Sequence, residues 1–186
     1  MTINESTSRE ILAEGRFLRL VREGKWEYAQ RTHSADAVVI VPCKSDGSLV
    51  LVEQYRVPVH ANVIEFPAGI VGDEAAFRGE PIEAAARREL LEETGYDAQQ
   101  VTRVFSGTCS AGLTDEFVTF CLATGLKRRS EGGGVDGENI KVHEIRRAEL
   151  DTWLRDRVEN GTKVDARLFT GIYLLDRFVA RNSFRP

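Results

Sequence analysis

The chain has 186 residues, of which 42% are hydrophobic and 29% are charged. This composition fits one compact globular domain and excludes a disordered chain, a collagen and a membrane-spanning bundle. Twenty-five Lys and Arg residues against 29 Asp and Glu give a net charge of −4, so the chain lacks the basic field that non-specific nucleic-acid binding requires. We therefore expect no nucleic-acid partner.

The beginning of the chain and its cysteines indicate where the protein works. Residues 1–8 are polar, lack the apolar core of a secretory signal, and are not followed by an 18-residue apolar run. Cys43, Cys109 and Cys121 are odd in number and form no Cys-x-x-Cys pair, as expected of buried, inert thiols in a reducing compartment. We expect a cytoplasmic protein with no membrane contact.

The first third of the chain alternates apolar and polar residues with a period of two, which is typical of β-strands. Turn residues such as Gly24 and Gly47 separate the segments, which indicates antiparallel strands joined by hairpins. A short strand follows before Phe66. The expected strands are Phe17–Val21, Trp26–Thr32, Ala35–Val41, Leu49–Tyr55 and Val63–Glu65.

The rest of the chain mixes helices and strands. A helix is expected over Pro81–Thr94, because proline suits a first helical turn and Gly95 is a typical helix terminator. The stretch Lys127–Gly137 contains three consecutive glycines and predicts a mobile loop. Further strands are expected at Val101–Phe105, Phe117–Ala123 and Ile140–Ile145, and further helices at Ala148–Glu159 and Asp165–Arg181. This order predicts the α/β (α+β) class, with a mixed sheet between helices.

Three carboxylates crowd one side of the expected helix. At about 100° per residue, Glu89 and Glu93 lie about 40° apart, and Glu92 lies about 60° from Glu89. Like charges at this spacing repel, and they stand near the negative end of the helix dipole. Arg88 can pair with Glu92, but a hard divalent cation such as Mg²⁺ or Mn²⁺ would compensate the others. A solvated acidic face is the alternative.

The segment Arg88-Glu89-Leu90-Leu91-Glu92-Glu93-Thr94-Gly95-Tyr96, with Glu80 eight positions before Arg88, resembles the signature of the Nudix hydrolases. That signature is Gly-x5-Glu-x7-Arg-Glu-aliphatic-x-Glu-Glu-x-Gly-aliphatic. One departure is visible: Gly69 stands eleven positions before Glu80, where the signature has six. Five extra residues therefore lie within Ile70–Gly79, and we expect them to enlarge the loop before the helix without shifting the helix register.

The rest of the chain is similar to the ADP-ribose and ADP-sugar pyrophosphatase branch of that family. Three segments carry this resemblance: Trp26–Arg31, Glu53–Arg56 leading to Glu65–Gly69, and Val164–Arg167. It implies an α/β/α sandwich and hydrolysis of ADP-ribose or related nucleoside-diphosphate sugars to a nucleoside monophosphate and a sugar phosphate. It also implies a flexible N-terminus (1–8), N-terminal antiparallel strands for homodimerisation and substrate contact (9–34), and a Nudix hydrolase domain (35–186).

The resemblance assigns roles to individual residues. Glu89, Glu93 and the backbone carbonyl of Ala68 would be ligands of Mg²⁺, with Mn²⁺ as an alternative ion. Glu92 would bind another ion or support the site, and Arg88 would orient the carboxylates. The helix carboxylates are then engaged with metal, so a general base must come from elsewhere.

A glutamate after the glycine-rich loop, Glu138, resembles the one that assists the attacking water in this branch. Glu131 and Asp136 in the same stretch are alternatives, and so is a solvated loop without a catalytic role.

Substrate contacts are expected from the strands. Trp26 offers a flat face for the adenine, and Glu27 can accept a hydrogen bond from its amine. Arg31 and Arg56 have the guanidinium fork that matches diphosphate oxygens, although each could simply form a surface ion pair. Asp115 and Glu116 end the segment Ser110–Glu116, which resembles a segment of bacterial ADP-ribose hydrolases. Two alternatives remain for them: they line the sugar or metal site, or they merely begin a strand.

Other functions receive less support. Gly107-x-x-Ser110-x-Gly112 lacks the spacing of a nucleophile elbow, so a Ser or Cys hydrolase is disfavoured. A Nudix-fold sensor that binds a nucleotide sugar without cleaving it is a stronger rival, but such a module is expected to have lost metal-ligand glutamates. Enzymes that prefer GDP-mannose or UDP-glucose also remain alternatives.

Overall fold

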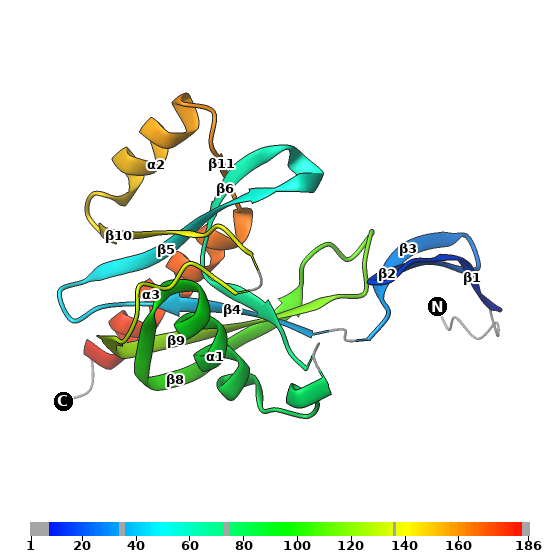
Figure 1. Cartoon of the computed structure of the whole chain (residues 1–186), viewed down its shortest axis with the longest axis horizontal. Coiled ribbons are helices and arrows are strands. Elements are labelled where there is room, and N and C mark those ends of the chain that lie inside the picture. Colours follow the sequence, from blue (N-terminus) through cyan, green and yellow to red (C-terminus); the bar gives the residue numbers. More distant parts are fainter. Residues whose placement is uncertain (1–7, 34–35, 73–74, 136, 184–186) are drawn as a thin grey trace.

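The structure is a computed structural model that describes residues 8–33, 36–72, 75–135 and 137–183 (Figure 1). The strands are β1 (Arg9–Glu14), β2 (Leu18–Glu23), β3 (Trp26–Arg31), β4 (Asp36–Pro42), β5 (Ser48–Arg56), β6 (Ala61–Glu65), β7 (Ala68–Ile70), β8 (Tyr96–Thr108), β9 (Phe117–Arg128), β10 (Lys141–Arg146) and β11 (Lys163–Val164). The helices are α1 (Ile82–Thr94), α2 (Leu150–Glu159) and α3 (Ala166–Ser183), with short 3₁₀ turns η1 (Val57–Val59) and η2 (Ala75–Phe77).

The side chains of β4 divide the body of the protein into two cores. Val38 and Ile40 are buried in one core with residues of α1, whereas Val39 and Val41 are buried in the other with residues of α2 and α3. This alternation follows from the period of two along a strand. Strands therefore separate α1 from α2 and α3, which confirms the α/β/α sandwich.

The strand layer consists of two four-stranded sheets of mixed direction. Their orders are β10-β5-β6-β11 and β7-β4-β9-β8. β4 runs parallel to β9 and β6 runs parallel to β11, while the other pairs are antiparallel. The strands β5, β6 and β7 thus bring the Glu53–Gly69 region across both sheets, beside α1.

The predicted hairpin between Ala35–Val41 and Leu49–Tyr55, which correspond to β4 and β5, is wrong. β4 and β5 lie in different sheets, and only a single bridge, Cys43 to Leu49, joins them near the turn. The physical reason is that both edges of each strand carry other partners: β4 pairs with β7 and β9, and β5 pairs with β10 and β6. Burial agrees with these internal positions, since β4 is buried from Ala37 to Pro42 and β5 from Ser48 to Glu53, as is typical of strands covered on both sides.

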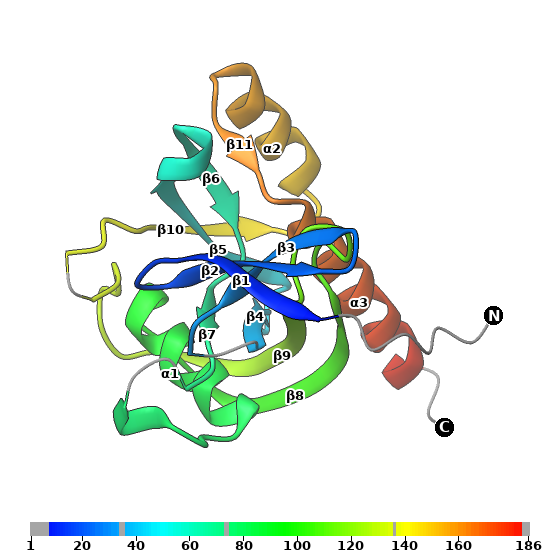
Figure 2. The same ribbon diagram turned by 90° about the vertical axis from the view of Figure 1, so that its right-hand side faces the viewer.

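The N-terminal strands form a separate antiparallel sheet, β1-β2-β3, at one end of the body (Figure 1; Figure 2 views this sheet from the front). The expected hairpin between β2 and β3 is confirmed, with Glu23 opposite Trp26. β1 was not among the strands expected from the period of two, because its sequence, Arg-Glu-Ile-Leu-Ala-Glu, does not alternate polar and apolar residues, and its residues are largely exposed. The N–H of Ala29 donates to the carbonyl of Leu113 at 2.8 Å, and this bond ties β3 to the body.

The cysteines differ in their surroundings. Cys121 is buried, as predicted, but Cys109 is exposed because it lies just beyond the end of β8, where the chain leaves the sheet. Cys43 is half-buried. Within the described ranges, no helix combines the length and the apolar character needed to cross a membrane.

Candidate active site

The C-terminal end of α1 is capped by the glycine-rich stretch. Gly95 ends the helix in the left-handed conformation, as predicted, with φ of 75°. The N–H groups of Gly133 and Gly134 then donate to the carbonyls of Glu93 and Glu92 at 2.9 and 3.1 Å. A Cβ on Gly132 would lie 2.4 Å from the Thr94 carbonyl carbon, so only glycine allows this approach. The stretch predicted as a mobile loop thus also holds the segment before Glu138 against α1.

Arg88 connects the carboxylates of α1. Its Nη1 donates to Glu89 Oε1 at 2.9 Å and to Glu92 Oε2 at 3.2 Å, which confirms the expected Arg88–Glu92 pair. Its Nη2 donates to Glu80 Oε1 at 2.9 Å. Burial disfavours the charged guanidinium, but the bond to Glu80 and the nearby carboxylates outweigh it and raise the Arg88 pKa. One cation therefore fixes three acidic side chains of the signature.

Glu93 is the buried member of the cluster, with 5% of its surface exposed. Its Oε2 accepts a hydrogen bond from the N–H of Ala68 at 3.2 Å. Burial, followed by repulsion from Glu89 and also from Glu138 and Glu65, raises the Glu93 pKa well above its ordinary value, and the Ala68 bond opposes this only in part. The site therefore concentrates negative charge around a carboxylate that water does not solvate.

The strand β7 brings backbone atoms to the same place. It is the edge strand of its sheet, and Ala68 pairs with Val39 of β4. The N–H of Ala68 points to Glu93 rather than to β4, and the N–H and C=O of one strand residue leave on the same side. The Ala68 carbonyl therefore faces the side of β7 where the α1 carboxylates lie. A Cβ on Gly69 would lie 2.0 Å from Glu89 Cδ, so this glycine makes room for the Glu89 side chain.

The three candidates for a general base have different positions. Glu138 is exposed, its Oε2 accepts from the Val135 N–H at 3.2 Å, and its charge acts on Glu93. The side chain of Glu131 is 95% exposed and pairs with Arg128 at 3.0 Å. Asp136 lies outside the described residues. Of the two described candidates, the geometry favours Glu138.

Arg31 and Arg56 both form ion pairs through their Nε atoms. Arg31 donates to Glu116 at 2.6 Å, and Arg56 donates to the buried Glu65 at 2.8 Å. Asp115 accepts a bond from Gln30, so Asp115 and Glu116 hold β3 on the body rather than only beginning a strand. For both arginines, the structure thus shows the ion pair that the sequence offered as the alternative to contact with the diphosphate.

Trp26 and Glu27 lie at the other end of β3. Trp26 is 63% exposed, and Glu27 accepts bonds from Arg22 Nε and Nη2 at 3.1 and 2.9 Å. Arg31 lies five residue steps along the strand from Trp26, which corresponds to about 17 Å. A single chain therefore places Trp26 far along the protruding sheet, with its indole available for contact.

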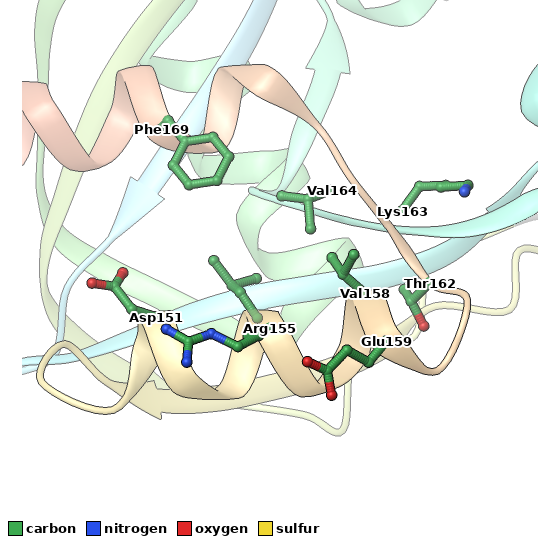
Figure 3. Close-up of a pocket in the computed structure, with 9 residues that line it drawn as sticks. Asp151, Arg155, Val158, Glu159, Thr162, Lys163, Val164 and Phe169 are labelled. Carbon is green, nitrogen blue, oxygen red and sulfur yellow. The ribbon is translucent and has the colours of Figure 1, made fainter.

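One cavity in the described part of the chain lies away from the carboxylates. It has a volume of about 850 Å³ and lies between α2, β11 and α3, on the side of the sheets remote from α1 (Figure 3). Val158, Val164 and Phe169 form its apolar wall, and Asp151, Arg155, Glu159 and Lys163 are the charged residues around it (Figure 3). A smaller cavity of about 300 Å³ is lined by His33, Arg78 and Glu80 among others. This second cavity touches the Arg88 cluster through Glu80, whereas the first does not.

Comparison with known proteins identifies the family. The model of the NUDIX domain matches residues 33–163, which include α1, the carboxylates bonded to Arg88, and Glu138. The chain belongs to the NUDIX domain family. In the structure, the Nudix signature thus forms helix α1, which lies beside the edge strand β7 and is capped at its C-terminal end by the glycine-rich stretch.

Three relatives and one solved structure extend the comparison. The chain is 35% identical to a methanol dehydrogenase activator of Bacillus methanolicus over 56% of its length, and 34% identical to an ADP-ribose pyrophosphatase of Bacillus subtilis over 59%. It spans only 54% and 57% of those two proteins. An ADP-sugar pyrophosphatase of Mus musculus is 31% identical over 88% of this chain and 83% of its own. A crystal structure of an ADP compounds hydrolase shares the fold, with a TM-score of 0.73, 22% identity and coverage of 94% and 93%.

The donor set of this Nudix site fits a divalent cation in type. Nudix pyrophosphatases generally use divalent metal ions, and the oxygens of Glu89, Glu93 and the Ala68 backbone are the hard ligands that such ions prefer. Among the described residues, no three acidic, His or Cys side chains converge closely enough to hold an ion by themselves. Arg88 engages Glu89 and Glu92 instead, so the carboxylates would have to share their charge between Arg88 and the ion.

Sequence reasoning missed one contact of the site. Phe77, in the lengthened segment between Gly69 and Glu80, stacks on Arg88 with its ring centroid 4.3 Å from the guanidinium carbon. The length of the insertion was visible, but no local motif shows which of its residues turns back onto the helix.

Proposed function

We propose that this Nudix protein hydrolyses the pyrophosphate bond of ADP-ribose or a related nucleoside-diphosphate sugar, using Mg²⁺ or Mn²⁺, and releases a nucleoside monophosphate and a sugar phosphate. The observation that carries the proposal is the buried Glu93, held on Ala68 and repelled by Glu89 and Glu138. A purely structural cluster would gain nothing from this repulsion, whereas a cation site requires concentrated negative charge.

Each residue of the site has a part in the proposal. Glu89, Glu93 and the Ala68 carbonyl hold the ion, and Glu92 supports the site or holds a further ion. When bound, the ion neutralises the diphosphate oxygens and lowers the pKa of a water molecule. Arg88 keeps the carboxylates oriented through its bonds to Glu80, Glu89 and Glu92.

Glu138 supplies the proton acceptor for the attacking water. It is exposed, its carboxylate is close enough to influence Glu93, and the Val135 N–H holds one of its oxygens. A base at this position can accept a proton from solvent-delivered water without giving up a ligand of the metal. The nucleophile is thus water, and the carboxylate remains unmodified.

Substrate binding uses Trp26, Glu27, Arg31 and Arg56. The exposed Trp26 would stack on the base while Glu27 accepts from its amine, and both arginines would turn their forks towards the diphosphate. The pairs with Glu116 and Glu65 give the two arginines fixed starting positions, since each is bonded through Nε. The names of the two pyrophosphatase relatives support this substrate class.

We propose that the protein acts as a homodimer in the cytoplasm. The β1-β2-β3 sheet and its first turn expose large apolar side chains, including Ile11, Phe17, Leu18 and Trp26. Exposed large apolar residues on a protruding element are typical of an interaction surface. In a dimer, the distant Trp26 of one protomer could reach the carboxylates of its partner. A monomeric mass by light scattering would contradict this arrangement.

Product analysis tests the proposed activity. The purified protein is incubated with ADP-ribose, GDP-mannose and UDP-glucose, each in Mg²⁺ and in chelator, and nucleoside monophosphates are separated chromatographically. We expect metal-dependent AMP release from ADP-ribose to be the fastest reaction. Metal-independent binding with no hydrolysis of any of the three substrates would support a nucleotide-sugar sensor instead.

A further inference from the structure

The lengthened segment between Gly69 and Glu80 places an aromatic ring, Phe77, on the arginine that organises the carboxylates. Phe77 ends the 3₁₀ turn η2, and its carbonyl accepts a bond from the N–H of Glu80 at 3.0 Å. Its ring covers the guanidinium of Arg88 at 4.3 Å. Phe77 therefore contacts both the side chain of Arg88 and the backbone of its partner Glu80.

The stacked guanidinium is shielded from water. The side chain of Arg88 is 16% exposed, and those of Glu80 and Glu89 are 13% and 14% exposed. The Nε atom of Arg88 is buried and has no hydrogen-bond partner among the described residues. Because Nε makes no bond that would hold the plane of the guanidinium, the ring of Phe77 and the three carboxylates are what fix it.

The plane of Arg88 in turn decides where the carboxylates point. Nη1 alone bonds both Glu89 and Glu92, so rotation of the guanidinium would move both carboxylates together. An arginine over an aromatic face is favoured by electrostatics and by packing, and the preference grows as water is removed. We infer that Phe77 is a positioning residue that orients the metal-holding carboxylates through Arg88. This inference rests on the proposed function, because it assigns the carboxylates to a cation.

Mn²⁺ binding to the protein alone tests this positioning without substrate. We expect Phe77→Ala to weaken Mn²⁺ binding, measured by isothermal titration, between about 3-fold and 30-fold, which is the range of a partly buried cation–π contact. Phe77→Tyr keeps the aromatic face and should bind as the unmodified chain does. Phe77→Leu keeps the bulk without the face and should lie between them. Phe169→Ala, an exposed phenylalanine on α3, is the matched control and should change nothing.

A double variant tests whether the effect passes through Arg88. Arg88→Lys removes the planar fork, so adding Phe77→Ala to it should cause no further loss of Mn²⁺ affinity. In the ADP-ribose assay, Phe77→Ala should raise the Mg²⁺ concentration for half-maximal rate by a similar factor and leave KM for ADP-ribose within about 2-fold. Circular dichroism checks that each variant folds.

Two results would overturn the inference. One is that Phe77→Ala binds Mn²⁺ as tightly as the unmodified chain. The other is that Phe77→Leu binds Mn²⁺ as tightly as Phe77→Tyr, which would mean that only the size of the side chain matters. If Phe77→Ala fails to fold, the comparison of the leucine and tyrosine variants decides. If the unmodified chain binds Mn²⁺ but hydrolyses no nucleotide sugar, the proposed function fails while the binding series still tests the role of Phe77.

Discussion

Replacing Glu93 by glutamine distinguishes the destabilising effect of its buried charge on the fold from its proposed role in binding a cation. Glutamine has the same shape and can still accept the hydrogen bond of the Ala68 N–H through its side-chain oxygen. It removes the buried charge that Glu89 and Glu138 repel. In chelator at neutral pH, we therefore expect Glu93→Gln to melt at the same temperature as the unmodified chain or higher.

The pH dependence follows from the sign of the shift. The Glu93 pKa is raised in the folded chain, so the ionised form is destabilising, and this loss of stability sets in as pH rises above the ordinary carboxyl value. In chelator, the gap in melting temperature between Glu93→Gln and the unmodified chain should shrink as pH falls towards about 4.5.

A divalent cation should reverse the order of the two proteins. At 100 times its dissociation constant, a bound ion stabilises the fold by about 2.7 kcal/mol. For a chain of this size that raises the melting temperature by about 5–10 °C. The unmodified chain should show this shift in Mg²⁺, and Glu93→Gln should lose most of it. We also expect AMP release to fall about 10²- to 10³-fold, since a cation supplies several kcal/mol of charge stabilisation.

Scanning fluorimetry with and without Mg²⁺ measures the two stabilities side by side. Glu83→Gln is the control, because Glu83 lies in the first turn of the same helix and pairs with Arg103 on the surface. It should keep the full Mg²⁺ shift. The reasoning is refuted if Glu93→Gln melts below the unmodified chain in chelator and retains the same upward shift in Mg²⁺.

Three other predictions concern the general base, the ion site and the cysteines. Glu138→Gln should lower kcat for AMP release about 10²-fold or more while Mn²⁺ affinity by titration changes little; unchanged kcat would move the base elsewhere. Gly69→Ala should abolish the Mg²⁺ shift in melting temperature, because its Cβ would displace the Glu89 side chain; a normal shift would show that Glu89 is not needed for the ion. A disulfide reagent at pH 8 should label the exposed Cys109 in the folded protein, but should label Cys121 only after denaturation, because burial raises the pKa of Cys121 to about 11. Rapid labelling of Cys121 in the folded protein would contradict its burial.

The sequence predicted local features of the site well because they depend on short spacing. The register of Glu89, Glu92 and Glu93 on α1 follows from helical geometry, and the end at Gly95 follows from its freedom to adopt positive φ. The pair of Arg88 with Glu92 is a contact within one turn. None of these needs knowledge of the rest of the chain.

Long-range pairing was less accessible. The strands β4 and β5 are close in sequence and are predicted as a hairpin, but each pairs on both edges with other strands, β4 with β7 and β9 and β5 with β10 and β6, so they lie in different sheets. The contact of Phe77 with Arg88 and the bond of Ala68 to Glu93 join segments whose approach depends on the whole sandwich. In the proposed homodimer, the position of Trp26 relative to the partner's carboxylates would depend on a further step, the association of two chains, which no spacing within one chain encodes.

Anomalous scattering from a crystal grown with Mn²⁺ tests the central claim most directly. The account predicts a manganese peak bounded by the carboxylates of Glu89 and Glu93 and by the carbonyl of Ala68, with Arg88 still bonded to Glu80. Those glutamates turned into solvent, with no manganese between α1 and β7, would contradict it.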